Sequence, residues 1–121
     1  MSTDVDVRVG RIYDEPEPGD GMRVLVDRIW PRGLTKSRAC LDEWCKAVAP
    51  SPALRTWYRH DPAKFEEFRR SYHLELVEPD AARALQHLRD LANMQPMTLL
   101  TASKRVELSD AAVLADLLRR A

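Results

Sequence analysis

Cationic and hydroxyl side chains are concentrated in two short segments, each directly after an apolar run. The first segment holds Asp27, Arg28 and Arg32, and the second holds Ser103 and Lys104. Guanidinium and ammonium groups, hydroxyls and free backbone N–H groups are the donors that bind phosphate or carboxylate. If the two apolar runs are strands of one sheet, the two segments lie together at its carboxyl edge and predict an anion site there.

Arg55 and His60 are candidates for the rim of the same site. His60 directly precedes a helix start, and its imidazole could act as a general base or as a donor to an anion. The structural alternatives are a capping or buried hydrogen-bonded His60, and a salt bridge between Asp27 and Arg28 or Arg55. The predicted ligand-binding residues are Asp27, Arg28, Arg32, Arg55, His60, Ser103 and Lys104.

Three apolar segments predict the strands that position these residues. Valines alternate with polar residues over 5–9, which indicates a half-buried strand running towards Tyr13. The run Val-Leu-Val at 24–26 has no alternation, as is typical of a strand covered on both faces in the middle of a parallel sheet. The short apolar run 97–101 fits a third, buried strand. Between the first two, an acidic segment rich in proline and glycine at 14–21 predicts a surface loop.

Apolar spacing and capping residues predict helices between and after the strands. Leu41, Trp44, Cys45 and Val48 are spaced i, i+3, i+4, i+7, which predicts a helix over 41–48, although eight residues do not exclude a strand. Capping side chains predict further helix starts, at Ser51-Pro52, Asp61-Pro62, Asp80 and Ser109. Strands separated by helices indicate an α/β fold with a small parallel or mixed sheet of three to four strands, flanked by helices, in one domain over residues 1–121.

The charge balance argues against a nucleic-acid or membrane partner. The 121 residues include 19 basic and 19 acidic side chains, so no global field attracts polyanions. Positive charge is concentrated in residues 21–60, with eight basic and three acidic side chains. No apolar run could span a bilayer, and the acidic N-terminus does not resemble a signal peptide. We therefore expect a cytoplasmic protein.

The sequence predicts no cofactor and no metal ion. Cys40 and Cys45 have no second cysteine pair or His-x-His nearby, so we interpret them as free thiols, at least one of them packed in the core. The four glycines do not form a phosphate-binding Gly-x-Gly-x-x-Gly loop. Ser103 lacks both a Gly-x-Ser-x-Gly context and a histidine nearby in sequence, which disfavours a serine nucleophile.

The chain resembles a known family over nearly its whole length. The resemblance is to the YeaO-like family of short bacterial proteins, a domain of unknown function, and it is carried chiefly by Val26-Asp27-Arg28-Ile29-Trp30-Pro31-Arg32-Gly33, Leu41-Asp42-Glu43-Trp44 and His60-Asp61-Pro62. The resemblance implies an α/β domain of three or four strands. It does not imply any particular activity.

A broader group related to that family carries a motif that matches the end of the run 97–101, the segment after it and the next helix start. The group has Cys or Tyr, then Glu or Ala, and then a Cys-His or Asn-His pair at these positions. This chain has Thr101, Ser103 and Ser109-Asp110 at the matching positions. The resemblance therefore implies that thiol and imidazole chemistry from those positions is absent here.

Three functional hypotheses follow from the sequence. The preferred one is an enzyme or sensor that binds an anionic small molecule such as a phosphate, a nucleotide or a carboxylate. The second is a nucleic-acid-binding or regulatory module that uses the basic segment 21–60. The third is a structural or protein-interaction domain whose Trp30, Trp44 and Trp57 contribute to a partner surface, although we prefer core packing as the account of these tryptophans.

Overall fold

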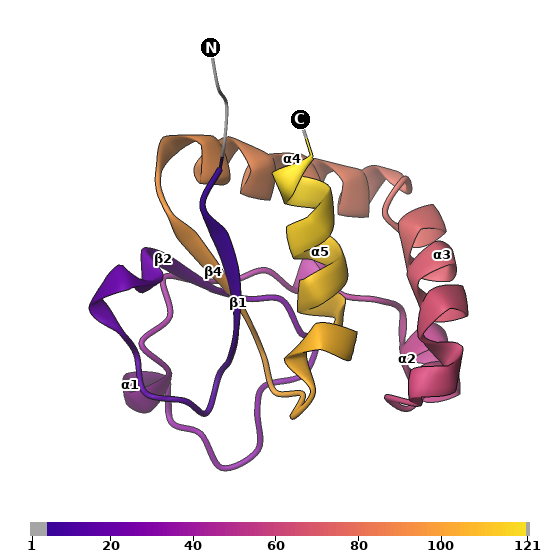
Figure 1. Ribbon diagram of the computed structural model, residues 1–121, viewed down its shortest axis with the longest axis horizontal. Coiled ribbons are helices and arrows are strands. Elements are labelled where there is room, and N and C mark those ends of the chain that lie inside the picture. The colour runs from indigo at the N-terminus through magenta and orange to yellow at the C-terminus, as the bar shows by residue number, and fades with distance from the viewer. Residues whose placement is uncertain (1–4, 121) are drawn as a thin grey trace.

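Four parallel strands form one sheet in the computed structural model, which describes residues 5–120 (Figure 1). The strand order is β1-β4-β2-β3, and every neighbouring pair is parallel. The strands are β1 (Val7–Arg11), β2 (Met22–Leu25), β3 (Glu43–Trp44) and β4 (Met97–Thr101). The α/β prediction is confirmed, and the carboxyl ends of all four strands lie at the same edge of the sheet.

The helices follow the strands and cover mainly one face of the sheet. α5 packs directly against β1 and β4, α4 packs on α5, and α2 packs on α3 (Figure 1). The bounds are α1 (Lys36–Ala39), α2 (Pro52–Tyr58), α3 (Phe65–Glu75), α4 (Pro79–Met94) and α5 (Asp110–Arg119). Within residues 5–120, no helix has the length and apolar character needed to cross a membrane.

Val24, Leu25 and Val26 are each 0% exposed, as the unbroken apolar run predicts. Val24 and Val26 belong to the large core cluster beneath the helices, whereas Leu25 belongs to a smaller cluster on the opposite face. Successive strand residues point to opposite faces, so three buried residues in a row require cover on both sides. All five residues of β4 are buried for the same reason, which confirms the strand predicted over 97–101.

Residues 41–48 form an edge strand and a turn, so the predicted helix is wrong. β3 is followed by the 3-10 turn Lys46–Val48. The backbone hydrogen bonds go to β2: the Asp42 amide donates to the Arg23 carbonyl at 2.9 Å, and the Cys45 amide donates to the Leu25 carbonyl at 2.8 Å. Trp44 packs in the smaller cluster and Cys45 in the larger one, which is the alternation of a strand. Eight residues of mixed spacing could not separate the two patterns.

Three of the four predicted helix caps are present. The side chain of Ser51 accepts from the Leu54 amide at 3.1 Å, that of Asp61 accepts from the Ala63 amide at 3.0 Å, and that of Ser109 accepts from the Ala112 amide at 3.3 Å. These bonds satisfy amides that have no partner within the helix. The predicted Asp80 cap is wrong, because α4 already begins at Pro79 and Asp80 lies in its first turn, paired with Arg83.

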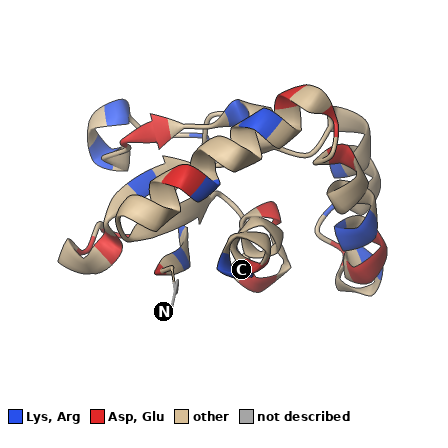
Figure 2. Cartoon of the chain, turned by 90° about the horizontal axis from the view of Figure 1, so that it is seen from above, with Lys and Arg blue, Asp and Glu red and all other residues tan. Residues whose placement is uncertain are grey.

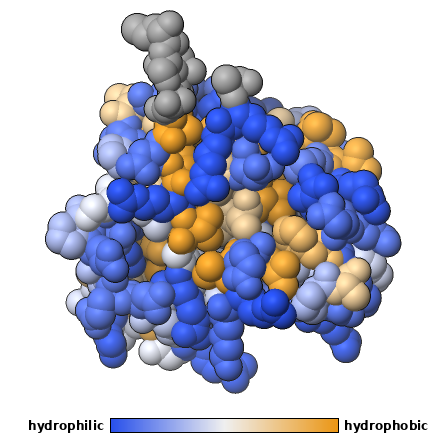
Figure 3. Space-filling model, viewed as in Figure 1, coloured by the Kyte–Doolittle hydropathy of each residue, from blue (hydrophilic) through white to orange (hydrophobic). Residues whose placement is uncertain are grey.

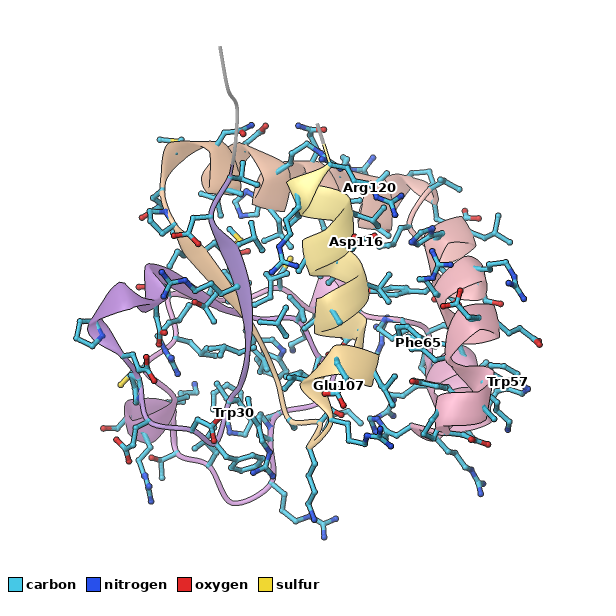
Figure 4. All side chains as sticks on the ribbon, in the orientation of Figure 1. Trp30, Trp57, Phe65, Glu107, Asp116 and Arg120 are labelled. Carbon is cyan, nitrogen blue, oxygen red and sulfur yellow. The ribbon has the colours of Figure 1, made fainter. Side chains whose placement is uncertain are left out.

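The three tryptophans lie in two separate places. Trp30 and Trp44 pack edge to face with ring centroids 5.2 Å apart, and both are half-buried in the smaller cluster. Trp57 lies on α2 at the other side of the molecule (Figure 4), where the Lys64 ammonium sits 4.9 Å from its ring. Trp57 therefore lies apart from the Trp30–Trp44 pair.

Charged residues of both signs are present on the longer helices. Basic and acidic residues both occur on α3, α4 and α5, whereas α1 carries only basic ones (Figure 2). The face turned to the viewer in Figure 1 is mainly hydrophilic with apolar side chains between polar ones (Figure 3). Of the two cysteines, Cys40 is exposed and Cys45 is buried, as expected for at least one core thiol. Burial raises the pKa of the Cys45 thiol to about 11, so it stays protonated at neutral pH.

Replacing Leu25 with Ala should lower the free energy of unfolding by about 2 to 5 kcal/mol, because its side chain is fully buried in the smaller core cluster and the truncation leaves a cavity there. Chemical denaturation of the two proteins measures this. Leu74→Ala is the matched control, since Leu74 is 71% exposed and its truncation should change stability by less than about 0.5 kcal/mol. Equal losses in the two variants would contradict the assignment of Leu25 to the core.

Candidate functional site

A cavity of about 380 Å³ opens at the carboxyl ends of β2 and β4. Six of the seven residues predicted from the sequence line it, namely Asp27, Arg28, Arg32, Arg55, His60 and Ser103. Lys104 is exposed and is not among the lining residues, because Ser103 faces the cavity and the next side chain turns to solvent. The predicted convergence of two distant segments is thus present for every site residue except Lys104.

The parallel register of β2 and β4 brings the two segments together. Leu25 pairs with Leu100, and the Val26 amide donates to the Leu100 carbonyl at 3.1 Å. The residues that follow each strand therefore start side by side. Because β2 and β4 are the two inner strands of the sheet, the loops that follow them meet over its middle, where a concave site forms in open α/β sheets.

Asp27 connects the two loops through its carboxylate. The Thr101 hydroxyl donates to it at 3.0 Å, and the Ala102 amide donates to it at 2.8 Å. The Asp27 carbonyl in turn accepts from the Trp44 indole N–H at 2.7 Å. Both the side chain and the backbone of Asp27 are therefore fixed by neighbouring elements.

Arg28 is held by backbone carbonyls and not by a carboxylate. Its guanidinium donates to the carbonyls of Ala49 at 3.2 Å and Pro50 at 3.3 Å. Among the ion pairs of residues 5–120, none joins Asp27 to Arg28 or Arg55, so the salt-bridge alternative is not what the structure contains. Arg28 uses only part of its five N–H donors on these carbonyls, and the others remain for a ligand.

Arg32 and Arg55 place two further guanidinium groups at the exposed part of the cavity. In the described part of the chain, neither forms an ion pair or donates a side-chain hydrogen bond. The Arg32 segment is positioned through its backbone, because the Tyr13 hydroxyl donates to the Arg32 carbonyl at 2.7 Å. The cavity therefore gathers three arginines without a neutralising carboxylate on any of them.

His60 lies in a tight turn at the cavity wall. Arg59 and His60 both have positive φ angles, 49° and 57°, which cost non-glycine residues about 1 kcal/mol or more each. This turn places His60 Nδ1 3.4 Å from the Ser103 hydroxyl, a distance well beyond the roughly 2.8 Å of an ordinary hydrogen bond from a hydroxyl. Ser103 and His60 are far apart in sequence but adjacent in the structure. Their distance is that of a loose contact and not of a serine activated by a histidine base.

Asp110 is a cavity residue that the sequence reasoning missed. It is the first residue of α5 and only 8% exposed, and its Oδ2 atom has no hydrogen-bond partner among the described residues. Burial raises the pKa of Asp110 well above its ordinary value, and the charge of Asp27 and a hydrogen bond between the two carboxyls raise it further. The raised pKa favours the neutral, protonated form of Asp110 beside the Asp27 carboxylate. Its position directly after the Ser109 cap, one loop beyond β4, is the signal that could have found it.

Aromatic rings form the apolar wall of the cavity. Tyr58 and Phe68 stack with centroids 4.1 Å apart and an interplanar angle of 12°, and Trp30 also lines the space. The Tyr58 hydroxyl donates to the Leu108 carbonyl at 2.7 Å, which ties the wall to the turn before α5. Cationic donors and ring faces thus line one and the same cavity.

The raised pKa of Asp110 makes stability depend on pH. A carboxyl whose pKa is higher in the folded chain than in the unfolded chain loses stabilising free energy as pH rises above the unfolded value of about 4. Asp110→Asn should remove this loss and unfold at a higher temperature than wild type at pH 7. Thermal unfolding between pH 4 and pH 8 measures the difference.

The control for this prediction is Asp116→Asn on the same helix, where the side chain is 51% exposed and pairs with Arg120. Asp116→Asn should leave the pH dependence close to that of wild type. A wild-type curve parallel to that of Asp110→Asn over this pH range would contradict a protonated Asp110.

Known proteins similar to this chain match it over almost its full length. Uncharacterised protein Rv3073c of Mycobacterium tuberculosis (strain ATCC 25618 / H37Rv) is 48% identical over 118 residues, which cover 98% of each chain. Uncharacterised protein YeaO of Escherichia coli (strain K12) is 40% identical over 115 residues, which cover 95% of this chain and 98% of the relative. No solved structure matches the chain.

A family match covers the same region. Residues 6–121 match the DUF488-N3i family, described as the inactive DUF488-N3 subclade. This match and the similarity to YeaO confirm the resemblance that the Val-Asp-Arg-Ile-Trp-Pro-Arg-Gly string indicated. The chain belongs to the DUF488-N3i family.

Proposed function

We propose that this protein binds an anionic small molecule, with a phosphate or carboxylate group, in the cavity at the carboxyl ends of β2 and β4. The observation that carries the proposal is the convergence of Arg28, Arg32 and Arg55 on one cavity without a carboxylate partner in the described residues. Three cations that are not neutralised repel one another, and an anion between them removes that cost.

The three arginines have different parts in the proposed site. Arg28 is half-buried and aligned by the Ala49 and Pro50 carbonyls, so its free N–H groups are oriented before a ligand arrives. Arg32 and Arg55 are exposed and attract the anion at the opening. His60 adds a donor at the wall, and the Tyr58 and Phe68 rings contact the apolar part of the ligand.

Binding without covalent chemistry is the form of this function that the site favours. The chain has Thr101 and Ser103 in the loop after β4, and Ser103 lies 3.4 Å from His60, a loose contact for proton transfer. The description of the family as an inactive subclade agrees with this choice. The protein then acts as a sensor or carrier of its ligand.

Arg32→Ala should weaken anion binding about tenfold, which corresponds to about 1.4 kcal/mol, because it removes charge-assisted hydrogen bonds at the cavity. Inorganic phosphate, acetate and adenosine monophosphate serve as probes, with affinities taken from NMR titration of the backbone amides. Shifts should cluster at residues 27–32 and 101–103.

The matched control is Arg70→Ala, because Arg70 is an exposed arginine on α3 outside the cavity lining. It should bind each probe as wild type does. Arg119 is not a suitable control residue, because its guanidinium donates to the Val7 carbonyl at 2.6 Å and 3.0 Å and connects α5 to β1. Its replacement would also change stability. The proposal is wrong if no probe binds, or if Arg70→Ala weakens binding as much as Arg32→Ala.

A further inference from the structure

We infer that the ligand is a zwitterion, whose ammonium group binds between Asp27 and Asp110 while its anionic group binds the arginines of the same cavity. The inference rests on the proposed function and adds the second half of the ligand. Anion binding does not explain why two carboxyl groups, those of Asp27 and Asp110, line the same cavity as the arginines.

The carboxyl pair is short of hydrogen-bond donors. Asp27 receives the Thr101 hydroxyl and the Ala102 amide, but Asp110 Oδ2 has no partner in the described residues and is buried away from water. A buried polar atom without a partner costs about 1 to 3 kcal/mol, and a buried charge costs more. The raised pKa of Asp110 favours a proton on this carboxyl pair, and such a proton supplies one donor and removes one negative charge.

No side chain of the described chain supplies a positive charge to this pair. Tyr72 approaches it from α3, but its hydroxyl donates to the Val48 carbonyl, and burial together with Asp110 and Asp27 raises its pKa, so it stays neutral. Tyr58 from α2 is likewise neutral and donates to a backbone carbonyl.

The cations that line the cavity are directed elsewhere. Arg28 donates to the Ala49 and Pro50 carbonyls, His60 contacts Ser103, and Arg32 and Arg55 lie at the exposed part of the cavity. In the part of the chain that the structure describes, no side-chain cation forms an ion pair with either Asp27 or Asp110.

An ammonium group can take the place of a proton on this carboxyl pair. It is compact, it carries three N–H donors, and it can donate to Asp110 Oδ2 and to Asp27 at once. When it binds, Asp110 releases its proton to solvent, so one positive charge leaves the pair as another arrives. No bond other than the Asp110 O–H breaks, and the free energy of binding then depends on pH in a defined direction.

Matched sulfonates test this inference. The probes are ω-aminoalkanesulfonates with two, three or four methylene groups, each compared with the alkanesulfonate in which a methyl group replaces the ammonium. The sulfonate does not titrate near neutral pH, and the ammonium must keep its protons to donate to both carboxyls, so the inference assigns a released proton to the protein. Isothermal titration calorimetry at pH 7 in buffers of different ionisation enthalpy gives the affinity and the number of protons released.

At least one amino compound should bind about tenfold more tightly than its methyl counterpart and release up to about one proton per chain. The Asp110→Asn protein should release no proton with the same compound, whereas Asp116→Asn, altered on the same helix outside the lining, should behave as wild type. Thermal unfolding of both variants confirms that they are folded.

The other outcomes separate the inference from the proposed function. If amino and methyl compounds bind equally and no proton is released, the zwitterion inference is wrong and anion binding stands. The zwitterion inference is also wrong if no sulfonate binds although phosphate, acetate or adenosine monophosphate does. If none of these anions binds, both the inference and the proposed function are wrong.

Discussion

The Asp27 carboxylate, held by the Thr101 hydroxyl and the Ala102 amide, is the interaction on which the candidate site depends. It joins the ends of two strands that are more than seventy residues apart in sequence. Without it, the loop carrying the arginines and the loop carrying Ser103 would share only the strand pairing beneath them. The strand register brings the loops near each other, and this carboxylate fixes how they meet.

The same carboxylate sets the electrostatics of the cavity. Because Asp27 is occupied by a hydroxyl and an amide, it does not neutralise Arg28, which turns to the Ala49 and Pro50 carbonyls. Its negative charge also raises the pKa of the buried Asp110. Within residues 5–120, the cavity therefore has arginines without a carboxylate partner and two carboxyls without a cationic partner. The anionic group of the proposed ligand matches the arginines, and its ammonium group matches the two carboxyls.

Where the sequence pattern had a single structural meaning, it predicted the fold correctly. Val24, Leu25 and Val26 can all be buried only in a strand covered on both faces, and the structure has that strand. The spacing of Leu41 and Val48 suits a helix, but tertiary hydrogen bonds to β2 decide in favour of an edge strand. Local periodicity over eight residues contains no information about that pairing.

The candidate site was predictable from residue types at strand ends, because parallel strands bring their carboxyl ends to one edge. This reasoning placed Asp27, Arg28 and Ser103 at the cavity. It could not decide which of two adjacent side chains turns inward, so it included Lys104. It also missed Asp110, whose significance comes from its burial and its carboxyl neighbour, neither of which is a property of the sequence around it.

The most direct test of the central claim, that the cavity binds an anion through its arginines, is a crystal structure of the protein soaked in selenate. Anomalous scattering from selenium locates the anion independently of the protein. The account predicts a selenium peak in the cavity, with selenate oxygens about 3 Å from the guanidinium nitrogens of Arg28 and of Arg32 or Arg55. Selenium peaks only at other surface sites, with the cavity free of selenate, would contradict it.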